Sequence, residues 1–173
     1  MEKLPRISTK TGDGGETGLG DGSRTPKNSP RVRSYGEVDE ANSALGLAIS
    51  LGAEPIESLK RIQEDLFALG ADLSTPGSEE RLIPKMLSRL EADLILADKD
   101  LPPLQNFVLP GGPPQAAALH LARAIVRRAE RAFWELPEGA SNVLGGQYLN
   151  RLSDYLFVLA RANGGDGEAR WEG

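Results

Sequence analysis

The chain has 173 residues, a formal net charge of -5 at pH 7, one histidine and no cysteine. This length suits one domain, and the acidic balance argues against a nucleic-acid-binding protein that works through bulk charge. The absence of cysteine excludes disulfides, thiolate metal sites and cysteine nucleophiles, and a single histidine excludes centres built from several histidines. The sequence has no signal-type segment and no run of about 18 apolar residues, so we expect a cytoplasmic protein that binds no membrane.

The first segment, Thr9 to Gly22, reads TKTGDGGETGLGDG. So much glycine disfavours a helix, and few β-branched residues disfavour an ordinary strand, so we expect a loop. Its N–H groups can converge on an anion, with hydroxyls and the ammonium groups of Lys10 and Lys27 as further donors. The spacing fits neither a Walker A loop nor a dinucleotide fingerprint. A disordered linker is the alternative, which the threonine and lysine content weighs against.

Three helices are expected next. The first begins at Ser34, with Ser34 as N-cap and Glu37 as its capping-box partner. A strip of small and polar residues on this helix, which includes Asp39, suits close contact with a neighbouring helix or subunit. The second helix is expected over residues 55–73 and the third over 85–99, and both carry apolar faces that indicate a structural role.

A proline-rich connection separates the third helix from the fourth. Five prolines between Asp100 and Pro114 exclude a persistent helix there,. Phe107 lies in this connection, just before the fourth helix. An aromatic side chain held in such a loop is either a hydrophobic plug over the end of a bundle or part of a ligand wall.

The fourth helix, expected over residues 115–135, has an unusual charge pattern. Arg123, Arg127 and Arg131 recur every four residues, so three guanidiniums lie along one ridge with Glu130 beside them. Like charges at this spacing cost about 0.2–0.5 kcal/mol per pair, whereas one charge-assisted hydrogen bond to an anion contributes about 1.5–3 kcal/mol. The ridge indicates an anion site or, alternatively, a solvated basic face.

A helical wheel of the same segment divides it into two arcs. The arc that faces the core carries Leu121, Ala122, Ile125, Val126, Ala129, Ala132 and Phe133, and the opposite arc carries His120, Arg123, Arg127, Glu130, Arg131 and Trp134.

On a fifth helix, expected over 146–162, Asn150 and Asp154 lie one turn apart. An aspartate that faces the arginines of the fourth helix would orient their guanidiniums, and an asparagine can both donate and accept hydrogen bonds. The alternative is that these residues form an ordinary polar face with a salt bridge.

Five helices with short connections predict an all-α, antiparallel five-helix bundle. The sequence lacks the Glu-x-x-His pairs of ferritin-type metal sites. The chain is read as a single domain over 1–173, with a loop segment over 1–33, the helical bundle over 34–162 and a tail over 163–173.

Five blocks of the sequence together resemble the PduO-type ATP:cobalamin adenosyltransferases: TKTGDGG, SYGEVDEANSALG, NFVLPGG, RAIVRRAER and NRLSDYLFVLAR. The resemblance covers nearly the whole chain, from Thr9 to Arg161. It implies a homotrimer with active sites between subunits. In the implied reaction, Co(I) of reduced cobalamin attacks C5′ of ATP and inorganic triphosphate leaves, with Mg²⁺ bridging phosphate oxygens.

The resemblance also implies roles for individual residues. Arg127, Glu130 and Asp154 are the expected catalytic residues, and no protein metal ligand is assigned. Phe107 matches the aromatic that helps to displace the lower axial ligand of cobalamin. The residues that match ATP-binding motifs are Thr9, Lys10, Thr11, Gly12, Thr17, Gly18 and Lys27, then Arg127, Arg128, Glu130, Arg131 and Asn150.

Three positions qualify this assignment. Arg123 matches a residue that pairs across the subunit interface with an acid at the position of Asp39. Gly14 stands where many relatives carry lysine, so we expect weaker ATP binding. Arg128 lies at the margin of the apolar arc, so its contact is expected with a neighbouring subunit or through its backbone. The rival functions are a nucleotide-binding regulator or corrinoid carrier, and a helical oligomerisation module whose arginines pair with acids across subunits.

Overall fold

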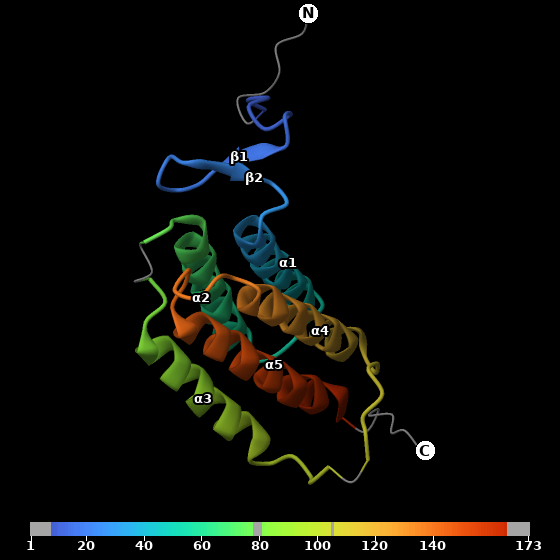
Figure 1. The fold of residues 1–173 in the computed structure, drawn as a ribbon. Helices are drawn as coiled ribbons and strands as arrows, with labels where there is room; N and C mark the ends of the chain where they lie inside the picture. The colour runs from blue at the N-terminus through green and yellow to red at the C-terminus, as the bar shows by residue number, and fades with distance from the viewer. Residues whose placement is uncertain (1–7, 78–80, 105, 166–173) are drawn as a thin grey trace, which may run out of the picture.

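The computed structural model describes residues 8–77, 81–104 and 106–165. Within these ranges it contains five helices and one small sheet (Figure 1). None of these helices is long and apolar enough to cross a membrane. The elements in chain order are β1 (Glu16–Gly18), β2 (Arg24–Pro26), α1 (Pro30–Ser50), α2 (Ile56–Ser74), α3 (Pro84–Asp98), α4 (Pro114–Trp134) and α5 (Val143–Gly164).

The start of α1 differs from the sequence prediction. Ser29 is the N-cap, because its side chain accepts a hydrogen bond from the Val32 N–H at 3.4 Å, and Pro30 occupies the first turn, where a proline costs no hydrogen bond. The prediction of Ser34 as N-cap was wrong, since Ser34 is buried inside the helix. The other helix boundaries lie within a few residues of those expected.

The glycine-rich segment forms a short hairpin, so the prediction that it contains no strand was wrong. β1 and β2 pair in antiparallel fashion, with Thr17 opposite Thr25. At the tip, the N–H and hydroxyl of Ser23 donate to Asp21 Oδ1 at 2.9 and 2.7 Å, and these bonds lower the pKa of Asp21. Threonines at paired positions supply the strand propensity that the glycines lack.

The hairpin meets the bundle through a glycine. The Gly20 N–H donates to the Ser74 carbonyl at 2.7 Å. A Cβ atom built on Gly20 would lie 2.2 Å from Oγ1 of Thr75. Only glycine therefore allows the hairpin to approach the end of α2 this closely.

Cross-helix pairs give the directions of the helices. Near the start of α2, the Ser58 hydroxyl donates to Asp93 of α3 at 2.8 Å. Later in α2, Asp65 accepts from Arg89, which precedes Asp93, so α2 and α3 are antiparallel. The α1 helix packs against α2 and α4, and α5 packs against α4 and α3 (Figure 1). Helices consecutive in the chain run in opposite directions, whereas α3 and α5 are parallel, because Glu91 contacts Arg151 and the later Pro102 contacts the later Arg161. The predicted five-helix bundle is confirmed.

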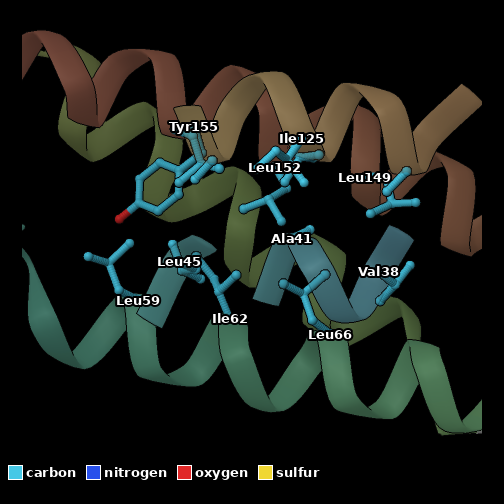
Figure 2. Packing of buried hydrophobic residues seen from close by; sticks show 14 of the residues in the cluster. Val38, Ala41, Leu45, Leu59, Ile62, Leu66, Ile125, Leu149, Leu152 and Tyr155 are labelled. Carbon is cyan, nitrogen blue, oxygen red and sulfur yellow. The ribbon is translucent and has the colours of Figure 1, made fainter. Parts of the chain in front are cut away.

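The core lies between α1 and α2 on one side and α4 and α5 on the other (Figure 2). Each of these helices contributes side chains at helical spacing, as the sequence pattern predicts. The labelled members are Val38, Ala41 and Leu45 from α1, Leu59, Ile62 and Leu66 from α2, Ile125 from α4, and Leu149, Leu152 and Tyr155 from α5.

One buried polar cluster connects α2, α3 and α5. The Asp65 carboxylate accepts from Arg89 at 2.7 Å and from the Tyr148 hydroxyl at 2.8 Å. Burial, with Asp65 as the next cause, raises the pKa of Tyr148 well above its ordinary value. Because each buried group has a hydrogen-bond partner, the cluster fixes α3 and α5 against α2.

Two glycines let α4 and α5 approach closely at the end where they are joined. A Cβ atom on Gly145 would lie 2.6 Å from the Phe133 ring, and one on Gly146 would lie 2.3 Å from the Trp134 ring. Phe133 is buried, whereas Trp134 is half exposed. The close approach brings the first turns of α5 against the last turns of α4, where two of the ridge arginines lie.

Candidate functional site

The arginine ridge of α4 has two exposed members, Arg127 and Arg131. Within the part of the chain that the structure describes, neither forms an ion pair; the Arg131 side chain donates to the Arg127 carbonyl at 2.9 Å. Two guanidiniums one turn apart on an exposed helix face, neither of them in an ion pair among the described residues, have the charge and the donors that suit a multiply charged anion,.

Arg123, the third member of the ridge, has a different environment. Its guanidinium lies over the ring of Phe157 of α5, 5.9 Å from the ring centroid. Burial, followed by repulsion from Arg127, lowers its pKa. Its Nε is buried and has no hydrogen-bond partner among the described residues. Among the described residues this half-buried cation forms no ion pair with an acid, and an unpaired charge in such a place is costly,.

The helical wheel of α4 was wrong for two residues near its N-terminal half. Leu121 is 52% exposed although it was placed on the core arc, and His120 is 4% exposed although it was placed opposite. The His120 ring lies 6.2 Å from the Phe157 ring. Because α5 packs beside α4, the covered arc is turned towards α5 and takes in His120.

Glu130 is held beside the exposed arginines by α5. The Asn150 side-chain amide donates to Glu130 Oε1 at 3.1 Å. Sequence analysis placed these two residues in one site, and the fold brings them together although they are 20 positions apart. The carboxylate keeps its second oxygen available for a donor or a metal ion.

Asp154 follows Asn150 by one turn, as expected. Its carboxylate accepts from Arg151 of the same helix at 3.0 Å, and both side chains are about half exposed. The expectation that Asp154 orients the arginines of α4 does not hold within one chain, because the Asp154 carboxylate pairs with Arg151 of its own helix instead. The ordinary salt bridge named as the alternative describes this contact.

Arg128 points away from the ridge towards α1. Its Nε donates to Glu37 Oε2 at 2.5 Å, and its terminal nitrogen forms an ion pair with Glu40. These partners, Glu40 first, raise the pKa of Arg128 above its ordinary value. A contact with a neighbouring subunit or through the backbone was expected for Arg128, whereas its side chain contacts α1 of the same chain. Glu37, read as a capping residue, is one of its partners.

The N-terminal loop gathers several donors. The hydroxyls of Thr9 and Thr11 lie 2.9 Å apart, and Lys10 has a positive φ of 60°. A Cβ atom on Gly12 would lie 2.9 Å from Nζ of Lys27, so the ammonium group lies directly beside the glycine backbone. Such a concave run of donors suits an anion.

Sequence analysis missed Arg24, which holds this loop in place. The Arg24 guanidinium donates to the Thr11 carbonyl at 2.8 Å and forms an ion pair with Glu16 at 3.3 Å. Nothing in its sequence context marks it, because the loop folds back 13 residues to reach it. No hydrogen bond or ion pair links the described part of this loop to Arg127 or Arg131, so one chain holds two separate sets of anion donors.

Two further surfaces complete the candidate site. Phe107, on the α3–α4 connection, is 78% exposed. Asp39 lines a groove of about 390 Å³ between α1 and α2, together with the highly exposed Phe67. Among the described residues, Asp39 forms no ion pair and no three acidic or histidine side chains are grouped as a metal site.

Comparisons with known proteins show which family the chain belongs to and which solved structures it resembles. The model of the family described as cobalamin adenosyltransferase matches residues 7–163. Corrinoid adenosyltransferases of Mycobacterium bovis and Bacillus subtilis are 48% and 43% identical; the alignments cover 97% and 96% of this chain, and 93% and 92% of theirs. A solved variant of the PduO-type ATP:corrinoid adenosyltransferase from Lactobacillus reuteri, complexed with cobalamin and ATP, has a TM-score of 0.87 at 36% identity over 96% of this chain and 97% of that one. A second variant, complexed with ATP, has a TM-score of 0.85 at 37% identity, over 95% of this chain and 98% of that one.

Proposed function

This chain belongs to the cobalamin adenosyltransferase family, and we propose that it transfers the 5′-deoxyadenosyl group of ATP to the cobalt of reduced cobalamin at a site that two protomers build together. One observation carries the proposal. Arg127 and Arg131 are exposed and form no ion pair within the described ranges, and Asn150 fixes the neighbouring Glu130. This surface suits a polyphosphate, which is the leaving group of the reaction.

The reaction is a displacement at carbon. The electron pair of Co(I) forms the Co–C5′ bond while the C5′–O5′ bond breaks, and triphosphate leaves with the electrons of that bond. The protein stabilises this step where negative charge accumulates. In our proposal, Arg127 and Arg131 bind the triphosphate from one side, and the loop residues Thr9, Lys10, Thr11, Gly12, Thr17, Gly18 and Lys27 bind it from the other.

Magnesium fits this site as a companion of the nucleotide. The described residues offer it no ready-made cage, and Mg²⁺ is commonly held by one or two carboxylates together with substrate phosphates. Glu130 is the carboxylate beside the arginines, and Asn150 supports it. When bound, the ion would neutralise charge on the phosphates, while Glu130 fixes its position.

A homotrimer explains the two unsatisfied surfaces of the chain. Among the residues that the structure describes, Arg123 and Asp39 form no ion pair, and Asp39 lines an apolar groove with an exposed phenylalanine. In our proposal, the α4 face of one protomer covers the α1–α2 groove of the next and pairs Arg123 with its Asp39. The N-terminal loop of one protomer then comes to the arginines of another, which brings the two sets of anion donors together.

Cobalamin is proposed to bind near the α3–α4 connection. Phe107 offers a large apolar surface to solvent, which suits the displacement of the lower axial ligand of the corrinoid,. Asp154, held by Arg151 on the exposed face of α5, is the acid proposed to lie near the reacting groups. A cytoplasmic location stays a prediction from the composition.

The direct test follows the corrinoid spectrum after the protein is mixed with ATP, magnesium and chemically reduced cobalamin. We expect adenosylcobalamin and one triphosphate per turnover. Binding of ATP without either product would favour a regulator or carrier and overturn the proposal. Arg127→Met separates the enzyme from an oligomerisation module, because the enzyme loses activity in a folded assembly, whereas the module loses assembly itself.

A further inference from the structure

Arg128 is adjacent in sequence to Arg127 but has the opposite environment. The Arg128 guanidinium is held on two of its nitrogens by Glu37 and Glu40 of α1. Glu37 is 17% exposed, Arg128 is 38% exposed and Glu40 is 55% exposed, so the contact with Glu37 is partly shielded from solvent and the contact with Glu40 is open. An ion pair in such a place is worth more than one in open solvent.

The charges of this cluster decide what it can bind. One guanidinium and two carboxylates give +1 − 2 = −1, so the cluster as a whole is negative. A polyphosphate that approached Arg128 would be repelled by both carboxylates and would have to displace them. Arg128 therefore adds no attraction for a triphosphate, although its sequence context groups it with the phosphate ligands.

The position of the cluster gives it another use. Consecutive residues of a helix point about 100° apart, so the direction of Arg128 also sets the direction of Arg127. Val126 and Ala129, the neighbours of this contact along α4, are buried in the core. The other ion pair between these helices, Arg33 with Glu135, lies at the end of α4 and is half exposed.

We propose that Arg128 is a positioning residue for adenosyl transfer: through Glu37 and Glu40 it fixes the rotation of α4, and so aims Arg127 at the leaving group, without binding phosphate itself. The inference rests on the proposed function, and it separates two neighbouring arginines that the sequence alone places in one set. If the Arg127 side chain pointed in another direction, the transition state would be stabilised less, whereas the affinity for ATP would change little.

The test compares four variants of the full chain: Glu37→Gln with Glu40→Gln as a double variant, Arg128→Met, Arg128→Lys, and Arg33→Met as the control that breaks the other α1–α4 ion pair. For each, kcat, the KM for ATP and the thermal midpoint are measured with reduced cobalamin. We expect kcat to fall about tenfold or more in the double variant and in Arg128→Met, with the KM for ATP within about threefold of wild type. Arg128→Lys should recover part of kcat, and Arg33→Met should leave kcat unchanged.

Two results would overturn the inference. A lower KM for ATP in the double variant, or a KM raised about tenfold or more in Arg128→Met at unchanged kcat, would make Arg128 a phosphate ligand. A lower thermal midpoint with kcat and KM both unchanged would make the contact merely structural. Failure of the wild-type protein to form adenosylcobalamin would instead remove the proposed function, so the two failures are distinguishable.

Discussion

Asn150 donates its side-chain amide to Glu130 at 3.1 Å and thereby joins α5 to the exposed face of α4. This bond fixes one carboxylate oxygen of Glu130 and leaves the other for substrate or metal. It is the single side-chain hydrogen bond among the described residues that connects two of the expected ATP-binding positions on different helices.

Removal of this bond should lower catalysis without unfolding the chain. In Asn150→Ala, Glu130 loses its fixed direction, and a hydrogen bond to a charged group is worth about 1.5–3 kcal/mol, so we expect kcat/KM to fall about 10- to 100-fold. Steady-state kinetics at varied ATP measures it. The control is Gln147→Ala, an exposed position one turn earlier on α5, which should retain wild-type kinetics. Equal losses in both variants would contradict the assignment.

The proposed subunit contact predicts a rescue. Asp39→Arg and Arg123→Asp should each weaken the trimer, because each places like charges face to face across the interface. The double variant restores an opposite pair and should recover assembly. Sedimentation velocity at matched concentrations gives the fraction of trimer. A double variant as defective as the single ones would show that these two residues do not meet.

The close approach of α4 and α5 predicts a graded effect of added methyl groups. Gly145→Ala places its Cβ against the buried Phe133 ring, so we expect a loss of about 1–3 kcal/mol in the free energy of unfolding. Gly146→Ala should cost less, because the half-exposed Trp134 ring can turn away. Gly70→Ala is the control: its Cβ would make only an ordinary contact with Val38 at 4.0 Å, and it should stabilise α2. Urea denaturation distinguishes the three.

The buried Tyr148 predicts a loss of stability at alkaline pH. Burial raises the pKa of Tyr148 in the folded chain, so the folded state keeps a proton that the unfolded state releases above a pKa of about 10. The contribution of Tyr148 is complete below that pH and is lost as the pH rises further. Unfolding free energies measured between about pH 8 and pH 11 should fall towards the alkaline end. Tyr148→Phe should flatten this decline, whereas Tyr35→Phe, at a half-buried position, should leave it unchanged.

The sequence predicts the helices well because their apolar residues recur with the helical period, and that period depends on local spacing alone. It fails where the outcome depends on a partner far along the chain. Leu121 is exposed and His120 buried because of where α5 packs, which no helical wheel of α4 contains. The first helix begins at Pro30 because Ser29 caps it, whereas the sequence pattern predicted Ser34 as the N-cap.

For the candidate site, too, the sequence predicts what depends on local spacing and misses what depends on distant partners. The ridge of Arg127 and Arg131 follows from the spacing of these residues along one helix. The grouping of Glu130 with Asn150 follows from the resemblance to the family, and the packing of α5 against α4 brings the two together. The partners of Arg128 could not be foreseen, because Glu37 lies 91 positions away and its charge also fitted a capping role. The hairpin was missed because cross-strand pairing stabilises it, and short glycine-rich strands show little periodicity.

The single backbone hydrogen bond from Gly20 to Ser74 has a consequence for product release. A hairpin that one backbone hydrogen bond joins to α2 can open at a small fraction of the free energy that unfolds the bundle. The amide hydrogens of β1 and β2 should therefore exchange faster than those of α1. In our proposal, the triphosphate product leaves when this hairpin opens, so the contacts that hold it during the chemical step need not be weak.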